Sequence, residues 1–518
     1  MDQPQGTAIS PKAPGSPRAP VSPKSPGNEK NLPDFATPVI GPLQKLHHFW
    51  KKGITNQDSF LLMMLRSLRV GGLEMESKLI ETLSQELKID ESSAYRISLL
   101  PFFQELNTAF NSLKKWKAGY DVETSMAFYP GNSKVRPQSR GTVLIVGSDR
   151  NPFGSILCPL VSALSAGNAV AILPPASTPR CNELLKVYLD TYLDTRVYHC
   201  FGTDERATIE VIGKVPFDTI CFTGPDNIAK EVLKLASAHL SPVILEIEAP
   251  IVFVVDANAN LELATAKISD YKYVHQQLQG NHGQTVILTE NSIKGQFQQA
   301  YQKGAKVASG IQLTSLGPNS TTKITPVQPS GDGKKGPGEV EAPLLDESVS
   351  GILPLNLEGF SDFDKVNSEI KRLRPYAIGY FGNKGSHLRE FLGNKTFSPL
   401  FFVNEFPLLP ANVLAPFRNA SQNGLGRLRG YDGFCQFSNM RAIYERPNSS
   451  FLDLSIRYSS DTENRFGKMK RLMGMTGMNA STVFCCVYFI IIAALAATGL
   501  YILNKHRGPL VTFPKFQN

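Results

Sequence analysis

Gly141-Thr-Val-Leu-Ile-Val-Gly147 is a short apolar run between two glycines, and it reads as a buried strand. Pro159 to Val170 reads as a helix that runs into the next strand. Phe217-Asp-Thr-Ile-Cys-Phe-Thr-Gly224 is predicted to be a strand and a turn, with a helix over residues 228–239. The apolar segment Pro242 to Glu248 ends this series, in which strands and helices alternate.

The residues before this series are predicted to be helical. Apolar residues recur at three- and four-residue steps between Leu43 and Trp116, as Leu61 and Leu65 illustrate. Residues 121–140 then read as a β-hairpin, and the Gly-rich stretch 328–340 reads as a surface insertion.

The amino-terminal residues are predicted to be disordered. Residues 1–34 contain eight prolines and four Ser-Pro pairs, with no apolar periodicity. Such a segment cannot bury enough surface to offset the entropy of ordering it. The Ser-Pro pairs resemble sites of proline-directed kinases, and an unmodified solvated spacer is an equal alternative.

Composition and charge bound the possible functions. The chain has 518 residues, is 42% hydrophobic and carries a formal net charge of +9. From Arg465 to Asn518 there are seven Lys or Arg and no Asp or Glu, a distribution that favours a membrane surface over nucleic acid as a partner. The seven cysteines form no Cys-x-x-Cys pair, so we expect neither a disulfide framework nor a metal site.

A carboxy-terminal apolar segment predicts a membrane anchor. Val483 to Leu503 is 21 residues without a charge, enough at about 1.5 Å per residue to cross a hydrocarbon core of roughly 30 Å. A buried core helix is the alternative. Because the amino terminus has no signal-peptide pattern, we expect a single-pass tail anchor with the main domain in the cytosol, at the endoplasmic reticulum or the outer mitochondrial membrane.

A hexapeptide and a series of ordered segments point to a family. Asn281-His-Gly-Gln-Thr-Val286 resembles the nucleophile loop of an aldehyde dehydrogenase, with Val286 in the place of the catalytic cysteine. The segments between 141 and 248 resemble, in order, those of the class 3-like members, a branch that includes membrane-anchored fatty aldehyde dehydrogenases. The resemblance covers residues 41–450 in all. Its later segments are Asp346-Glu347, Ile352-Leu-Pro354, Pro375 to Phe381, and Asn423-Gly-Leu-Gly426.

This resemblance implies an α/β fold with a Rossmann-type cofactor domain, an α/β substrate domain and a β-hairpin that serves oligomerisation. Together with the segments described above, it divides the chain into nine parts: a Ser-Pro-rich tail (1–40), a helical layer (41–120), the oligomerisation hairpin (121–140), the cofactor-type domain (141–248), the substrate domain (249–430), an oligomerisation strand (431–464), a basic juxtamembrane segment (465–482), the transmembrane helix (483–503) and a short tail (504–518).

The resemblance also assigns catalytic positions. Aldehyde oxidation needs a thiolate nucleophile, a donor to the oxyanion and a base for the deacylating water. Val286 stands at the nucleophile position, where an isopropyl group cannot add to a carbonyl carbon. Arg150 stands at the position of the oxyanion-binding asparagine, and Glu246 at that of the general base. A one-residue shift would bring Asn151 into the oxyanion role, but Pro152-Phe153 fix the register against it.

The cofactor implied by the family is NAD or NADP, and part of its expected contact set is present. Thr223 and Gly224 match the turn before the pyrophosphate, and Glu347 matches the carboxylate that binds the nicotinamide ribose. The lysine and glutamate that hold the adenosine ribose are missing from Leu173-Pro-Pro-Ala176, and Pro225 replaces a serine.

Two hypotheses about function follow. In the first, the chain is a membrane-anchored pseudoenzyme that binds a long-chain aldehyde or another lipid-like ligand, as a homodimer or as a heterodimer with an active paralogue. In the second, it is an active NAD(P)-dependent fatty or apocarotenoid aldehyde dehydrogenase with an atypical site, or a hydrolase that uses Glu246 and water without a thiolate. A replacement nucleophile among the other cysteines would have to lie at the tunnel through which substrate enters in the family. Cys221 is expected to pack under the cofactor instead. Neither hypothesis involves nucleic acid.

Overall fold

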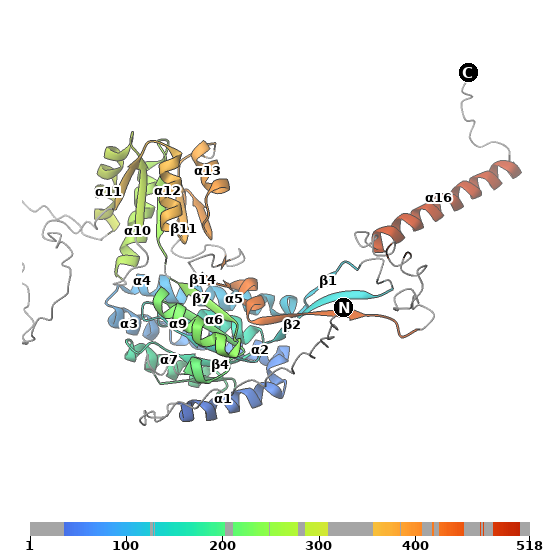
Figure 1. Ribbon diagram of the computed structural model, residues 1–518, viewed down its shortest axis with the longest axis horizontal. Coiled ribbons are helices and arrows are strands. Elements are labelled where there is room, and N and C mark those ends of the chain that lie inside the picture. Colours follow the sequence, from blue (N-terminus) through green and yellow to red (C-terminus); the bar gives the residue numbers. More distant parts are fainter. Residues whose placement is uncertain are drawn as a thin grey trace, which may run out of the picture.

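The protein is described here by a computed structural model with two α/β bodies, a helical layer and a projecting arm (Figure 1). The residues that the structure describes are 36–124, 128, 130–202, 211–247, 249–277, 285–308, 356–383, 385–406, 417–418, 424–449, 467, 470 and 480–507.

The helical layer comes first in the chain. It consists of α1 (Ala36–Lys51), η1 (Ile54–Asn56), α2 (Asp58–Glu74), α3 (Glu76–Leu87), α4 (Glu91–Ala94), a π-helical turn (Tyr95–Leu99) and α5 (Leu100–Ala118). The leucines at three- and four-residue steps are buried, among them Leu61, Leu65 and Leu68. Helix α1 begins at Ala36, inside the range expected for the tail, because its apolar residues Leu43 and Leu46 pack on the first sheet's core.

A six-stranded sheet forms the core of the first body. Its order is β14-β7-β6-β3-β4-β5, with β14 antiparallel to β7 and the other strands parallel. The strands are β3 (Thr142–Val146), β4 (Ala169–Leu173), β5 (Tyr198–Cys200), β6 (Thr219–Gly224), β7 (Val243–Ile247) and β14 (Gly424–Leu425), and the helices are α6 (Gly154–Ser165), α7 (Pro179–Tyr192) and α9 (Asp226–Ala236). Every residue of β3, β4 and α6 is buried, as their continuous apolar runs predict.

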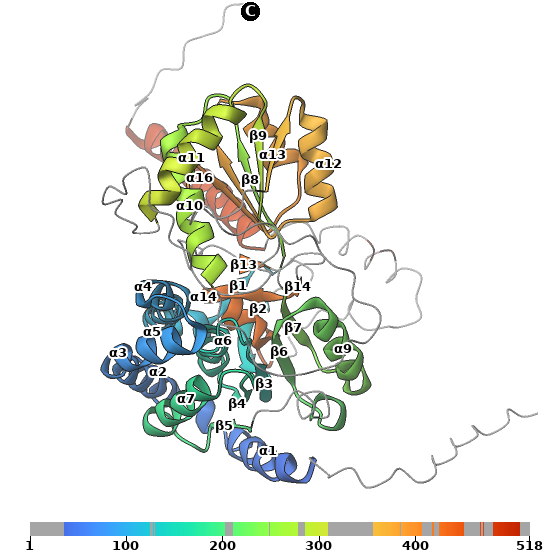
Figure 2. The same ribbon diagram turned by 90° about the vertical axis from the view of Figure 1, so that its left-hand side faces the viewer.

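The second body contains a five-stranded parallel sheet of order β10-β9-β8-β11-β12 and lies above the first in Figure 2. Its strands are β8 (Ile251–Val255), β9 (Thr285–Glu290), β10 (Leu357–Phe360), β11 (Ala377–Phe381) and β12 (Leu400–Val403), and its helices are α10 (Leu261–Gln277), α11 (Lys294–Ala308), α12 (Phe363–Leu373) and α13 (His387–Lys395). The alternating strands and helices of the two bodies give the α/β fold that the sequence predicted.

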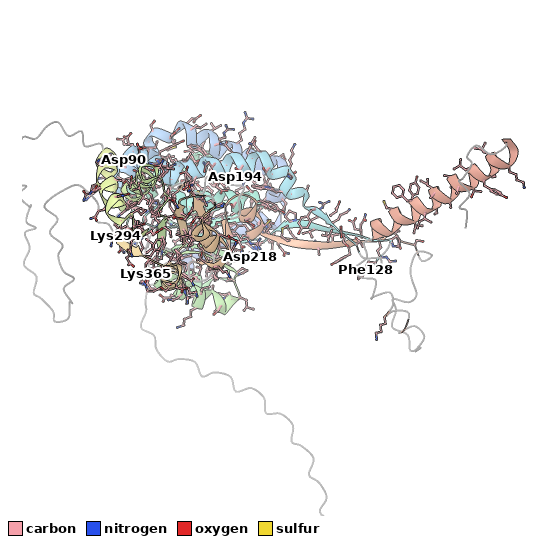
Figure 3. The ribbon with its side chains drawn as sticks, turned by 90° about the horizontal axis from the view of Figure 1, so that it is seen from above. Asp90, Phe128, Asp194, Asp218, Lys294 and Lys365 are labelled. Carbon is pink, nitrogen blue, oxygen red and sulfur yellow. The ribbon has the colours of Figure 1, made fainter. Side chains whose placement is uncertain are left out.

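The projecting arm is a three-stranded antiparallel sheet. It is built from β1 (Tyr120–Val122), β2 (Asn132–Ser139) and β16 (Ser438–Glu445), in the order β1-β2-β16. Strands β2 and β16 pair from Ser438 opposite Ser139 to Glu445 opposite Asn132. Figure 3 places Phe128 toward the outer end of the arm, away from the two bodies.

The carboxy-terminal helix α16 spans Ala480–Arg507. Within the part of the chain that the structure describes, no helix is both long and apolar enough to cross a membrane. The transmembrane helix expected over residues 483–503 is therefore not shown.

Candidate functional site

The chain passes from the first body to the second between β7 and β8, and Glu246 lies on β7 just before this junction. Glu246 is opposite Gly424 of β14 and is paired in register with Thr223 of β6. The hydroxyl of Thr223 donates to Glu246 Oε2 at 3.4 Å. The structure therefore brings together Glu246, the expected base, and Thr223, one of the expected cofactor contacts, and Gly224 follows at the end of β6.

An arginine beside this pair was not expected from the sequence. Arg429 lies between β15 (Arg427–Leu428) and α14 (Gly430–Gln436), and its Nη1 donates to Cys158 Sγ at 3.4 Å. Its φ of 75° is rare for a residue with a side chain and indicates a backbone held by its surroundings. Burial opposes its charge, yet four neighbouring groups raise the pKa of Arg429 above its usual value: Cys158, Glu246, Glu105 and Tyr376. We call these five residues the Arg429 cluster.

Glu105 anchors the cluster to the helical layer. It projects from α5, is 1% exposed, and accepts the N–H of Gly430 at 2.9 and 3.1 Å. Burial raises the pKa of Glu105 to about 7, although Arg429 and the Gly430 N–H favour its charged form. Since Tyr376 immediately precedes β11, the cluster connects the helical layer, the first sheet and the second sheet.

A signal for Glu105 was present in the sequence, whereas none identified Arg429. Buried positions of α5 recur at Phe102, Leu106, Ala109 and Leu113, and Glu105 falls on the same stripe. A carboxylate on an apolar stripe requires a buried partner. That partner lies more than three hundred residues away, so its identity could not be derived from local pattern.

Val286 does not lie with Glu246. It is the second residue of β9, pairs in register with Val252 of β8 and is 0% exposed. Its cluster is an apolar core of the second body that includes Val254, Leu288 and Ile378. The structure therefore places the expected nucleophile position inside the second sheet. Thr285 is the first residue of the same strand, and the other four residues of the hexapeptide, Asn281 to Gln284, lie outside the described residues.

The expected oxyanion position lies in the turn after β3. Arg150 is half-buried there, and its N–H donates to Ser148 Oγ at 3.4 Å. Neighbouring Asn151 has a structural role: its Oδ1 accepts the N–H of Gly154 at 2.9 Å, and its Nδ2 donates to the Ile97 carbonyl at 2.9 Å. The side-chain amide of Asn151 thus joins the start of α6 to the π-helical turn. Both its oxygen and its nitrogen already form hydrogen bonds within the protein.

The region expected to bind the nucleotide contains few suitable groups. Pro225 caps α9, so the donor position there lacks an N–H, and Asp226 occupies the first turn in an ion pair with Lys230. A carboxylate at the amino-terminal end of a helix makes the favourable interaction with the helix dipole that a bound phosphate would otherwise make. The Pro175 carbonyl is engaged within the protein, by Asn182 Nδ2 at 2.6 Å. Glu347 lies outside the described residues.

The cysteines of the two bodies are poor nucleophiles. Burial raises the pKa of Cys158 and of Cys181 to about 12 and that of Cys200 to about 11, and it raises those of Cys221 and Cys435 as well. Thiols in such surroundings stay protonated near neutral pH, and the thiolate is the reactive form. No group of three or more His, Cys, Asp or Glu among the described residues could hold a metal ion.

Comparisons with known proteins agree with this architecture. The sequence model of the Aldehyde dehydrogenase family matches residues 74–328. Aldehyde dehydrogenase family 3 member H1 of Arabidopsis thaliana is 26% identical, with 85% of this chain and 95% of that protein covered. For 4,4'-diaponeurosporen-aldehyde dehydrogenase of Staphylococcus aureus the identity is 25%, with coverages of 76% and 91%. For the dimeric NADP-preferring aldehyde dehydrogenase of Canis lupus familiaris it is 24%, with coverages of 80% and 96%.

Among solved structures, the substrate-bound state of Staphylococcus aureus AldH superposes with a TM-score of 0.70 at 21% identity, covering 84% of this chain and 99% of that one. This likeness supports the fold. The match to the family model and the family 3 relatives show that the chain belongs to the aldehyde dehydrogenase superfamily and is related to its class 3-like members.

Proposed function

We propose that this protein is an aldehyde dehydrogenase-like pseudoenzyme that acts by binding and not by oxidising aldehydes. The observation that carries the proposal is the position of Val286, which is fully buried in the core of the second sheet. A side chain without exposed surface cannot contact a substrate, and valine has no nucleophilic atom. The raised pKa values of the buried thiols argue against a substitute cysteine.

The surroundings of Glu246 support the same proposal. In the family a base at this position must take a proton from water, which requires a carboxylate directed at substrate. Here Glu246 accepts a hydrogen bond from Thr223 and is an electrostatic partner of Arg429. We infer that Glu246 is retained as a member of the Arg429 cluster.

We propose a lipid-like ligand, such as a long-chain aldehyde or acid. One relative is named for 4,4'-diaponeurosporen-aldehyde, an apocarotenoid-type compound. The apolar surface of α16 supports a membrane as the place of action, because Phe489, Ile490 and Leu495 on it are each more than 60% exposed and large apolar surfaces are normally covered. We therefore propose that α16 anchors the main domain to a membrane from the cytosolic side.

We further propose that the arm mediates dimerisation, as a homodimer or with an active paralogue. Its strands expose Tyr120, Val122 and Tyr444, the last at 74%, and an exposed sheet edge is a template for pairing. One of the relatives is described as dimeric.

An active NAD(P)-dependent enzyme is the alternative, and the presence of Glu246 beside Thr223 is the observation that favours it. Binding of nucleotide separates the two. Calorimetric titration of the purified full chain with NAD and NADP should give no saturable heat, and long-chain aldehydes should not be oxidised. Cofactor-dependent turnover that is lost in Glu246→Gln would establish the enzyme and overturn the pseudoenzyme.

A further inference from the structure

A groove outside the candidate site lies between α1 and the segment 214–218. Its volume is about 630 Å³, within the range of roughly 300–1,000 Å³ that is usual for small-molecule sites. It is at the amino edge of the six-stranded sheet, since Thr142 at the start of β3 and Asp218 just before β6 both line it. Asp218, labelled in Figure 3, lies on the main body and not on the arm. The groove is therefore remote from Thr223 and Gly224 at the carboxyl end of β6.

The inner part of the groove is apolar. Leu43 and Phe217 lie at its base with 6% and 3% of their surface exposed, and Ile40 and Val215 extend this surface outward. Both walls therefore contribute hydrocarbon surface, which stabilises a ligand by removing its apolar chain from water.

The rim of the groove is basic. His48 and Lys51 project from α1 and Lys214 from the opposite segment. No Asp or Glu occurs between Ala36 and Gln57, so α1 itself contributes no acid to this rim. Asp218 is the sole acid among the described lining residues, and its Oδ2 already accepts the Thr142 N–H at 2.7 Å.

We propose that this groove binds a single-chain anionic amphiphile, with its carboxylate or phosphate head at the basic rim and its apolar chain on Leu43 and Phe217. The combination of a hydrocarbon base with cations on two walls fits such a ligand better than a neutral lipid or a free anion. This site is separate from the Glu246 region, so it does not depend on whether the chain oxidises aldehydes.

The test is photo-cross-linking of the purified full chain in a neutral maltoside detergent with a diazirine-labelled palmitate. Cross-links are expected in peptides that cover residues 40–51 and 211–218. Lys51→Glu combined with Lys214→Glu should reduce the labelling by at least about fivefold. Lys45→Glu is the matched control, because Lys45 is on α1 but does not line the groove, and it should leave labelling unchanged.

Further arms distinguish the ligand classes. The corresponding diazirine alcohol should label more weakly than the acid, and millimolar inorganic phosphate should not displace the acid. Equal labelling by the alcohol, or an equal loss of labelling in Lys45→Glu and in the double variant, would each overturn the proposal. If the double variant fails to fold, as judged by its thermal unfolding, Lys51→Gln and Ile40→Asp provide milder tests of the head-group and chain contacts.

Discussion

Arg96 and Asp270 form a two-bond salt bridge between the helical layer and α10 of the second body. Arg96 Nη1 donates to Asp270 Oδ1 at 2.9 Å, and Nη2 donates to Oδ2 at 2.5 Å. Paired bonds of this kind fix relative orientation as well as adding energy. The bridge therefore helps to position the second sheet over the first.

We expect Asp270→Asn to weaken this junction modestly. Both side chains are partly exposed, so the loss of stability should be about 1 kcal/mol. A double-mutant cycle with Arg96→Gln, followed by urea unfolding, should give a coupling energy of the same order. The exposed pair Asp226 and Lys230 provides the control cycle, for which we expect a smaller coupling. Equal couplings in the two cycles would contradict a positioning role for Arg96.

Arg429→Met should be far more costly. The change leaves Glu105 and Glu246 without their shared cation, and removing one member of a partly buried charge cluster costs about 3 kcal/mol or more. The midpoint of urea unfolding measures the loss. Arg427→Met, two residues away at an exposed site with Asp432 as its partner, should change stability by less than about 1 kcal/mol. Adding Glu246→Gln to Arg429→Met should recover part of the loss, because one uncompensated charge is then removed.

The raised pKa of Glu105 predicts that the stability of the protein depends on pH. Its folded-state pKa of about 7 lies above the unfolded value of about 4.3, so the folded protein binds the proton more tightly. The stabilising contribution is complete below the unfolded pKa and is lost as pH rises through about 7, a change of up to roughly 3 kcal/mol. Unfolding free energies at pH 5.5 and pH 8 should differ by about 2 kcal/mol in the wild type and much less in Glu105→Gln. An unchanged slope in the variant would assign the pH dependence to another group.

Apolar patterning predicted the helical layer and the alternating strands and helices of the first body, whereas the chemistry at the junction of the bodies could not be derived from it. The runs around Val143 and Val252 are strands because β-branched residues pack well in buried sheets. The run Thr285-Val286-Ile-Leu-Thr289 has the same pattern, and this pattern indicates β9 more directly than the loop that the resemblance implied. Glu105 and Arg429 are brought together by the tertiary fold, which a local pattern does not encode.

Deletion of residues 480–518 should release the protein from membranes. The full chain should remain in the pellet after extraction with alkaline carbonate, because exposed apolar side chains of α16, among them Phe489 and Ile490, would be buried in lipid. The truncated protein should appear in the supernatant. Deletion of residues 508–518 alone keeps α16 and should leave the protein in the pellet. Release of the full chain by carbonate would contradict the proposed anchor.

Val286→Cys should not create an aldehyde dehydrogenase. The new thiol would lie on β9 among Val252, Leu288 and Ile378, where burial keeps a thiol protonated and excludes aldehyde. We expect it to react with iodoacetamide only after unfolding, and we expect no oxidation of long-chain aldehydes with NAD or NADP. Stability should fall by only about 1 kcal/mol, because cysteine is a small apolar side chain. The wild-type protein, labelled before and after unfolding, is the control for the cysteines that are already present. Rapid labelling of the introduced thiol in the folded state would mean that this position opens to solvent, and the argument for a pseudoenzyme from its burial would then fail.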